Sequence, residues 1–193
     1  MTKQELRKTY LEKRQSLSEA EYGQLNFLLY QNFFASTDLS FIKVLHIFLP
    51  IHAKKEPDTW LIIDRIQREF PHIRISIPRV NNEKGELENF YFEGLHQLAT
   101  NEWGIQEPKR GLPTEPEKID LVLVPLLVFD EQGHRVGYGK GYYDRFLQHV
   151  KDSTLRIGLS FFPPEKVLPE ISPRDISLTH AITPQNLYKF KGR

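Results

Sequence analysis

Three glycines alternate with a tyrosine and a lysine in the segment RVGYGKGYYDRF, residues 135–146. Glycine loses more backbone freedom on folding than any other residue, so such a cluster lowers stability unless it serves a purpose. Glycine backbones allow N–H groups to approach phosphate oxygens closely, and Lys140 would add a mobile positive charge. The segment therefore has the residue types that could hold a polyphosphate.

The spacing of this glycine loop does not match the general nucleotide-binding motifs. It reads G-x-G-x-G rather than G-x-G-x-x-G, and Gly133 lies six residues before Gly139, where the P-loop needs five. Lys140 is also not followed by Ser or Thr, as the P-loop lysine is. Motif spacing alone leaves phosphate binding and a purely structural turn equally open.

Asp144 follows the glycine loop and has two interpretations. In the first turn of a helix, an aspartate interacts favourably with the macrodipole, by about 0.3–1 kcal/mol. Alternatively, its carboxylate is a hard oxygen ligand that could hold Mg²⁺ beside phosphates. The neighbouring Tyr142 and Tyr143 could face a ligand or pack in the core, and we expect at least one of them to pack.

A second set of candidate residues lies near the N-terminus. Lys3, Arg7, Tyr10 and Arg14 fall at i, i+4, i+7 and i+11 of a helix predicted over residues 2–15, which places them on one face. A face of this kind is ordinarily a solvated cationic surface. Three cations with few acids beside them could instead complete a triphosphate site from the far end of the sequence.

Several other chemistries are absent from the sequence. The seven histidines show no H-E-x-x-H spacing, and no serine lies in G-x-S-x-G. Without cysteine, the chain has no disulfide, thiolate metal site or thiol nucleophile, and a cytoplasmic location is expected. We therefore set aside metallopeptidases and serine hydrolases of the elbow type.

Composition also limits the partners of the chain. Lys and Arg number 26 against 25 Asp and Glu, so the positive excess typical of sequence-independent nucleic-acid binding is missing. No apolar run approaches the ~20 residues that span a bilayer. The opening MTKQELRKTY has no apolar segment behind its charges, so neither a signal nor a transit peptide is predicted. We expect a monomer with no nucleic-acid or membrane partner.

The elements that must position these residues alternate between helices and strands. Beyond residues 2–15, helices are predicted from Ser18, whose hydroxyl forms a capping-box pattern with Glu21, and over 59–70 and 142–150. Strands are predicted over 41–50, 73–80, 119–130, 155–162 and 176–183. The alternation predicts a layered α/β fold with a largely parallel central sheet flanked by helices, in a single domain spanning residues 1–193.

The sequence predicts a buried strand in one segment and a peripheral region in another. The continuous apolar run IDLVLVPLLVFD, residues 119–130, is typical of a strand covered on both faces. Residues 81–118 contain one alternating segment, ELENFYFEGL, followed by a Pro-rich stretch. We expect a peripheral hairpin or excursion there.

Three separated motifs carry a resemblance to a known family. They are KQELR at 3–7 with RQSLS at 14–18, FLPI with EPDT within 48–59, and LVPLLVFDEQGHRVGYGKGYYDRFL at 123–147. Together they resemble the 5-formyltetrahydrofolate cyclo-ligase family, also called methenyltetrahydrofolate synthetase, and the last motif is the most specific. WGIQEP at 103–108 and PRDISLTHAIT at 173–183 are weaker echoes, so the resemblance covers nearly the whole chain.

The resemblance implies both a fold and a reaction. The fold would be similar to the CoA-transferase and ribose-phosphate-isomerase group. The reaction would convert 5-formyltetrahydrofolate to 5,10-methenyltetrahydrofolate with ATP and Mg²⁺. The formyl oxygen would attack the γ-phosphate, and N10 would then close the ring as phosphate leaves. Such phosphoryl transfer needs positioning and charge neutralisation more than a covalent nucleophile, which suits the residue types above.

The family's functional positions can be carried over by matching motifs. The implied ATP contacts are Lys3, Gln4, Glu5, Leu6, Arg7, Arg135, Val136, Gly137, Tyr138, Gly139, Lys140, Gly141, Tyr142 and Tyr143. The implied folate contacts are Leu49, Glu56 and Trp103, together with Tyr138, Gly139, Lys140, Gly141 and Tyr142. Asp144 and Asp175 match the magnesium carboxylates, and Lys140 and Asp144 match the catalytic positions.

Two of these positions have a clear chemical rationale. A carboxylate at Glu56 suits the pterin ring, whose N–H and amino donors can be accepted together. Lys140 stands where other members of the family carry either lysine or glycine, so the resemblance implies an electrostatic role that is not indispensable. The loop PIHAKK before Glu56 is longer than in some members.

Two other functions stay open at this point. One is a non-catalytic nucleotide- or folate-binding module that has kept the fold, and the other is a phosphosugar isomerase of the same fold group. The paired magnesium carboxylates and the KQELR segment favour the cyclo-ligase.

Overall fold

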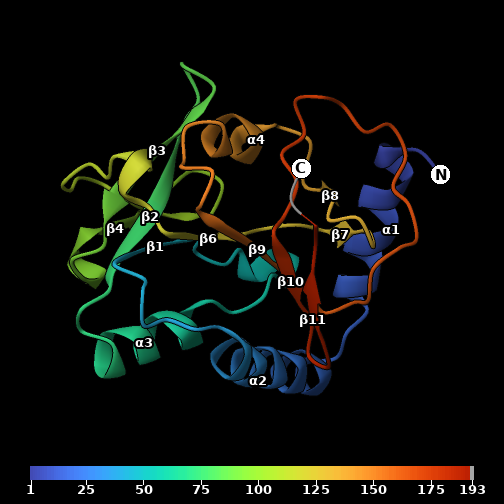
Figure 1. Cartoon of the computed structure of the whole chain (residues 1–193), viewed down its shortest axis with the longest axis horizontal. Helices are drawn as coiled ribbons and strands as arrows, with labels where there is room; N and C mark the ends of the chain where they lie inside the picture. The colour runs from blue at the N-terminus through green and yellow to red at the C-terminus, as the bar shows by residue number, and fades with distance from the viewer. Residues whose placement is uncertain (192–193) are drawn as a thin grey trace.

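The computed structural model describes residues 1–191, which build one large sheet and several helices (Figure 1). The seven-stranded sheet has the order β11-β10-β9-β6-β1-β2-β3. Its strands are β1 (Val44–Ile47), β2 (Arg74–Asn81), β3 (Glu86–Tyr91), β6 (Leu121–Val124), β9 (Leu155–Leu159), β10 (His180–Ile182) and β11 (Leu187–Lys189). The five inner strands are parallel, whereas β3 and β11 pair antiparallel at the two edges. The predicted α/β class and largely parallel sheet are therefore confirmed.

Helices cover both faces of the sheet. They are α1 (Lys3–Gln15), α2 (Glu19–Ser36), α3 (Trp60–Glu69) and α4 (Tyr142–Leu147). Figure 1 shows α2 and α3 on one side of the sheet and α4 on the other, with α1 beside the small strands β7 and β8. Every residue of β1 and of β6 is buried, because both strands are covered on both faces.

Local sequence signals account for the helix starts. Thr2 and Glu5 form a capping box at the start of α1, and Ser18 and Glu21 form the expected one at the start of α2. Within residues 1–191, no helix is long and apolar enough to cross a membrane.

The predicted strand over 119–130 is wrong in extent, because it contains two separate strands. Pro125 has no N–H to donate and interrupts the run after β6. The remainder forms β7 (Val128–Phe129), which pairs antiparallel with β8 (Arg135–Val136) in a hairpin outside the main sheet. This hairpin carries the glycine loop away from the sheet and toward α1.

Other boundaries also differ from the prediction. The helix predicted over 142–150 ends at Leu147, and the strands predicted over 41–50 and 176–183 are shorter, at β1 and β10. In the region 81–118, β3 joins the main sheet as an edge strand, whereas β4 (Leu98–Thr100) and β5 (Gln106–Pro108) form the expected peripheral hairpin. The apolar runs extend beyond these strands because residues such as Phe48, Leu49 and Leu178 are buried in loops, whereas Phe41 is exposed.

The direction of the strand order reverses at β1, in the middle of the sheet. From β1 the chain moves to β2 on one side, and later returns to β6 on the other side of β1. In open α/β sheets, ligands gather at the carboxyl ends of the strands at such a reversal. The loop after β1 and the chain after β6 lead to Glu56 and to the glycine loop, respectively, so the topology brings these two candidate segments together.

Gly133 provides a test of how the β7–β8 hairpin is packed. Its φ is +89°, and an added Cβ would lie 2.7 Å from Cγ of Phe190 and 3.1 Å from the carbonyl oxygen of Leu178. We predict that Gly133→Ala lowers the free energy of unfolding by about 2 kcal/mol, because it adds both backbone strain and overpacking. Urea denaturation measures this change.

Gly23→Ala is the matched control for that measurement. Gly23 lies in α2, is exposed, and has no neighbour within 4 Å of an added Cβ. Alanine is the better helix former there, so we expect a gain of about 0.5–1 kcal/mol. A Gly133→Ala protein as stable as the wild type would contradict the packing described above.

Candidate active site

Helix α1 lies directly against the glycine loop. Nε of Arg7 donates to the carbonyl oxygen of Gly137 at 3.0 Å. Gly139 has a φ of +91°, and an added Cβ would lie 3.0 Å from Cζ of Arg7. Glycine at 139 is therefore needed both for the backbone conformation and for the close approach of the guanidinium group. The N-terminal helix and the glycine loop form one unit although about 130 residues separate them.

A chain of three side chains continues from α1 into the interior. Nη2 of Arg14 donates to the Tyr138 hydroxyl at 2.6 Å, and that hydroxyl donates to Oε1 of Glu56 at 2.7 Å. The other oxygen of Glu56, Oε2, accepts from the N–H of Ile51 at 2.7 Å. Glu56 is only 3% exposed, so its carboxyl group is buried and yet bonded through both oxygens.

Burial is the main influence on these titrating groups. It raises the pKa of the Glu56 carboxyl above its usual value, although the Ile51 N–H and the Tyr138 hydroxyl act in the opposite direction. The positive charges of Arg14 and Lys54 also act to lower it. Burial and the nearby Glu56 carboxylate raise the pKa of the Tyr138 hydroxyl, which therefore keeps its proton.

The loop that carries Glu56 is tied to the corner between α1 and α2. Nε2 of Gln15 donates to the carbonyl oxygen of Ala53 at 2.7 Å. Lys55 has a φ of +45°, and its ammonium group donates to the carbonyl oxygen of Leu17 and lies 3.6 Å from a carboxylate oxygen of Glu19. The extra length of PIHAKK is thus used for contacts with the N-terminal helices.

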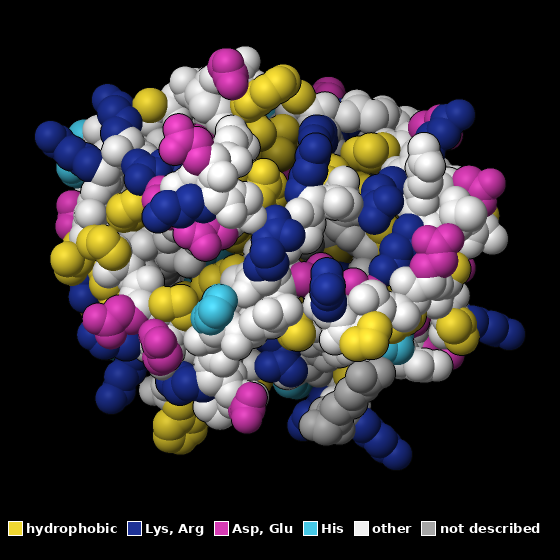
Figure 2. All heavy atoms as spheres, turned by 90° about the horizontal axis from the view of Figure 1, so that it is seen from above, with side chains coloured by type: hydrophobic (Ala, Val, Ile, Leu, Met, Phe, Trp, Pro, Cys, Tyr) yellow, Lys and Arg dark blue, Asp and Glu magenta, His cyan; other side chains and the backbone are white. Residues whose placement is uncertain are grey.

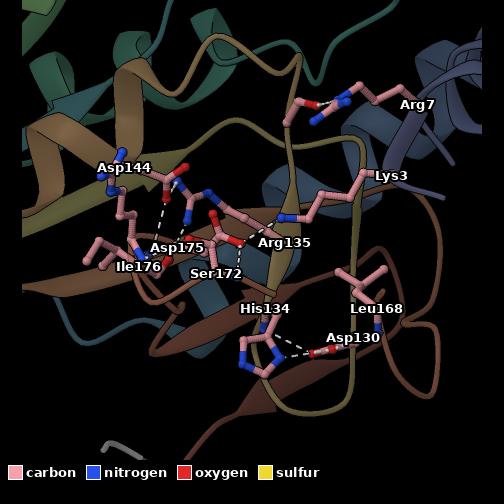
Figure 3. A network of polar contacts seen from close by, with 12 residues as sticks. Lys3, Arg7, Asp130, His134, Arg135, Asp144, Leu168, Ser172, Asp175 and Ile176 are labelled. Carbon is pink, nitrogen blue, oxygen red and sulfur yellow. Dashed lines mark hydrogen bonds and ion pairs between the residues drawn. The ribbon is translucent and has the colours of Figure 1, made fainter. Parts of the chain in front are cut away.

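Two carboxylates lie on the other side of the glycine loop, with Arg135 between them (Figure 3). Nη2 of Arg135 contacts Oδ1 of Asp144 at 2.9 Å, and the same oxygen accepts from the N–H of Ile176 at 3.0 Å. Oδ2 of Asp175 accepts from Nζ of Lys3 at 2.6 Å and from the N–H of Ser172 at 2.9 Å. The segment before β10 therefore contributes a carboxylate to the site.

The carboxylates of Asp144 and Asp175 fit a magnesium ion that arrives with a nucleotide. In each carboxylate one oxygen is engaged, and the other has no hydrogen bond within residues 1–191. That part of the chain contains no group of three or more His, Asp or Glu side chains placed to hold a metal. Mg²⁺ on nucleotides is usually held by one or two carboxylates plus phosphates and water, so two half-free carboxylates suit it.

The turn between β7 and β8 fixes the start of the glycine loop. Asp130 is fully buried, and its Oδ1 accepts from the N–H groups of Gln132 and His134 at 3.0 and 2.9 Å. Its Oδ2 accepts from the N–H of Leu168 at 3.0 Å and lies 3.1 Å from Nδ1 of His134 (Figure 3). These bonds stabilise the predicted turn and place Arg135 at the site.

The two tyrosines after the loop differ in environment. The ring of Tyr143 packs against both main hydrophobic clusters, as expected of at least one of the pair. Its buried hydroxyl has no hydrogen-bond partner within residues 1–191. Tyr142 is half-buried, with its hydroxyl 3.4 Å from Oδ1 of Asn82. Lys140 is exposed, and among residues 1–191 its one hydrogen bond is the one that its carbonyl oxygen accepts from Arg145 at 2.9 Å.

Figure 2 shows the molecule from above, with Lys and Arg side chains spread among Asp and Glu side chains and apolar atoms.

Several residues that were predicted to contact the ligands lie apart from the other site residues. Trp103 is 72% exposed. Its backbone N–H donates to Oδ1 of Asn101, and it makes no hydrogen bond to the glycine loop. Leu49 is buried in the core. On α1, Gln4 and Glu5 are exposed, Glu5 caps its own helix, and Leu6 packs beneath α1 on the β7–β8 hairpin. The side-chain contacts of α1 with the loop come from Lys3, Arg7 and Arg14 instead.

Arg14 is the site residue for which no contact was predicted. It is 3% exposed and reaches Tyr138 from the same helix face as Lys3 and Arg7. The i, i+4, i+7, i+11 spacing indicated this face, and the solvated-surface interpretation is wrong for Arg14. What the spacing could not reveal is the partner, since Tyr138 lies 124 residues further along.

Comparisons with known proteins agree with the motifs. The model of the 5-formyltetrahydrofolate cyclo-ligase family matches residues 1–184. A Mycoplasma pneumoniae 5-formyltetrahydrofolate cyclo-ligase is 30% identical, over 83% of this chain and 86% of its own. The mouse 5-formyltetrahydrofolate cyclo-ligase is 29% identical, over 88% and 86%. The solution structure of Aquifex aeolicus 5,10-methenyltetrahydrofolate synthetase aligns with a TM-score of 0.84 at 32% identity, covering 100% of this chain and 95% of that one.

The fold and the similarity to these proteins identify the protein as an enzyme, of the class of ligases that act on folates. The chain belongs to the 5-formyltetrahydrofolate cyclo-ligase family.

The Lys3–Asp175 pair makes a pH-dependent prediction. Burial alone would raise the pKa of the Asp175 carboxyl, but the bonds from Lys3 and Ser172 outweigh it and hold the pKa below its usual value. A carboxyl whose folded-state pKa is depressed stabilises the fold above its unfolded pKa and loses that contribution as pH falls through the folded value. We predict that Asp175→Asn lowers the free energy of unfolding by about 0.5–1 kcal/mol near pH 7.

The difference between the two proteins should be smaller at about pH 3 than near pH 7, because the contribution of a carboxyl with a depressed pKa begins to be lost as pH falls below its unfolded value of about 4. Urea denaturation at both pH values measures it. Glu83→Gln is the control, because Glu83 is exposed and has no side-chain partner within residues 1–191. An equal loss at both pH values would mean that the ion pair is not the cause.

Proposed function

We propose that the protein converts 5-formyltetrahydrofolate to 5,10-methenyltetrahydrofolate, consuming ATP and releasing ADP and phosphate. The observation that carries the proposal is the convergence of distant segments on the glycine loop. Helix α1, the loop after β1 and the segment before β10 all contact it or its flanks through side-chain hydrogen bonds. The names of the family and its relatives support the choice of substrate.

In this proposal ATP phosphates bind between α1 and the glycine loop. Lys3 and Arg7 supply positive charge from the helix, and both are half-buried and already held by partners. Gly137 has open space where a Cβ would be, so the backbone leaves room for a ligand there. Lys140 extends from the loop into solvent, from which it could reach a phosphoryl group undergoing transfer.

The folate part would bind toward Glu56. This carboxylate accepts one hydrogen bond on each oxygen, from Ile51 and Tyr138, which leaves further lone pairs for donors of the ring. A buried carboxylate rejects ligands that lack matching donors, because it would then be left incompletely bonded. Tyr138 thus links the folate end of the site to the nucleotide end.

The proposed reaction has two steps. The formyl oxygen attacks the γ-phosphorus as the bond to the ADP oxygen breaks, which gives an iminium phosphate. N10 then bonds to the formyl carbon, its proton is lost, and the carbon–oxygen bond breaks as phosphate leaves. Arg7 and Lys140 would stabilise the charge on the transferring group, and the loop would hold the reacting atoms in line.

Asp144 and Asp175 would hold Mg²⁺ through their unengaged oxygens. When bound, the metal would neutralise charge on the phosphates of ATP. Arg135 keeps the Asp144 carboxylate oriented through its 2.9 Å contact, and Lys3 does the same for Asp175 at 2.6 Å.

Turnover tests the proposal directly. Purified protein with ATP, Mg²⁺ and 5-formyltetrahydrofolate should produce the near-ultraviolet absorbance of the methenyl product. Omission of ATP is the control and should abolish the signal. No absorbance change with folded protein would contradict the proposal. Binding of both ligands without turnover would indicate the binding module, and ATP-independent isomerisation of a sugar phosphate would indicate the isomerase.

Arg7→Ala tests the nucleotide end of the site. Removal of a charged donor costs about 1.5–3 kcal/mol, so we predict a rise of about tenfold or more in KM for ATP, with KM for the folate little changed. Lys8→Ala is the matched control, because Lys8 also carries one positive charge on α1 but is exposed, and its one acidic partner within residues 1–191 is Glu12 at 4.0 Å. Equal effects of the two substitutions on KM for ATP would mean that Arg7 acts only through the general positive charge of the surface and not by contacting the nucleotide.

A further inference from the structure

Arg14 is a buried cation without a carboxylate partner. It is 3% exposed, and among residues 1–191 it forms no ion pair with an acidic side chain within 4.0 Å. Its Nε has no hydrogen-bond partner there, and its one side-chain hydrogen bond goes to the Tyr138 hydroxyl at 2.6 Å. Burial of a charge with so little compensation is unfavourable, so a merely structural role would favour a neutral side chain at this position.

The chemistry of Arg14 fixes the direction of the hydrogen bonds beyond it. A guanidinium group has only donors, so the Tyr138 oxygen must accept from Arg14. The hydroxyl proton of Tyr138 is therefore directed to Oε1 of Glu56. Glu56 accepts there and from the N–H of Ile51 on its other oxygen, so neither of these hydrogen bonds requires the carboxyl to carry a proton.

We propose that Arg14 is a positioning residue that orients Tyr138 and thereby keeps the buried Glu56 carboxylate ionised and ready to accept from the substrate. The part that concerns the substrate rests on the proposed function, in which Glu56 accepts hydrogen bonds from the folate ring. The orientation of Tyr138 and the ionisation of Glu56 concern this chain alone.

Groups from five elements face Glu56, and only Arg14 acts on it both by charge and by hydrogen-bond direction. Arg14 comes from α1, Tyr138 from the glycine loop and Tyr143 from α4. The hydroxyl of Tyr22, from α2, donates to the carbonyl oxygen of Glu56. Lys54, from Glu56's own loop, lies 4.3 Å from the centre of the Tyr138 ring, so it supplies charge without bonding the hydroxyl.

The sign of the effect follows from burial. Burial raises the pKa of the Glu56 carboxyl, and the charge of Arg14 acts against it. Without Arg14 the pKa rises further, so the carboxyl holds a proton at higher pH than in the wild type. A neutral carboxyl carries an O–H donor on one oxygen and no negative charge, so it accepts more weakly from donors of the ring, and binding of the substrate weakens until the pH is high enough to restore the charge.

Steady-state kinetics across a pH series tests this. For Arg14→Met we expect KM for 5-formyltetrahydrofolate to rise about tenfold at about pH 6 and to approach the wild-type value toward about pH 9. KM for ATP should change little. Arg14→Lys keeps a charged donor and should recover most of the loss. Lys54→Met removes charge but not hydrogen-bond direction, and should cause a smaller shift.

A measurement without substrate separates this inference from the proposed function. Carbon-13 NMR of the glutamate carboxyls, with Glu56 assigned from a Glu56→Gln sample, gives the pKa of Glu56 in wild type, Arg14→Lys and Arg14→Met. A higher pKa in Arg14→Met supports the inference, and an unchanged pKa overturns it. A raised pKa with unchanged folate KM would uphold the link from Arg14 to Glu56 and overturn the assignment of Glu56 to folate.

Arg14→Lys also guards against misfolding of the Met variant. If Arg14→Met loses its native circular dichroism, the comparison is made between Arg14→Lys and the wild type. The lysine ammonium is a point charge that bonds the Tyr138 oxygen less tightly than the planar guanidinium group. A small upward shift in the Glu56 pKa is then the supporting result, and no shift overturns the inference.

Discussion

The contact between α1 and the glycine loop organises the whole candidate site. Arg7 reaches the carbonyl oxygen of Gly137 at 3.0 Å and lies against Gly139, where an added Cβ would come within 3.0 Å of its guanidinium group. The same helix supplies Lys3 to Asp175 and Arg14 to Tyr138. Because α1 packs on the β7–β8 hairpin rather than on the main sheet, its position depends on the hairpin that also carries the loop. A change in that packing would therefore move the cations and the loop together.

Much of this arrangement could be predicted from local patterns, since those patterns have local physical causes. The capping boxes at Ser18 and Thr2 set the starts of two helices, and the buried runs gave the parallel strands. The cationic face of α1 followed from helical spacing alone. The glycine loop was visible from its residue types, and the resemblance supplied the family, Asp144 and, through the weaker segment 173–183, Asp175, which lie on either side of Arg135.

What could not be predicted depends on contacts between distant residues. Pro125 divides an apolar run that has no other break, and the remainder pairs with β8 in a hairpin that α1 covers. The ion pair of Lys3 with Asp175 spans 172 positions, and no pattern in either segment specifies the other. The spacing placed Arg14 on the correct face of α1 but did not predict that it is buried. Its burial involves Tyr138 and Glu56, which lie on two other loops. Trp103, by contrast, matched a motif and yet lies exposed on the peripheral hairpin region.

Lys3 and Arg7 already have partners within the chain, which limits how a ligand can bind. Lys3 bonds Asp175 and Arg7 bonds Gly137, so these side chains are ordered in advance and lose less of the ~1.5–2 kcal/mol of rotamer entropy of a free Lys or Arg. In the proposed function, a nucleotide must then share or replace these bonds rather than meet vacant donors. Within residues 1–191, Asp144 and Asp175 each keep one oxygen without a hydrogen bond, so a cation could join them without breaking the contacts to Arg135 and Lys3. Binding of the cation and the phosphates together would therefore preserve the charge balance that the chain maintains by itself.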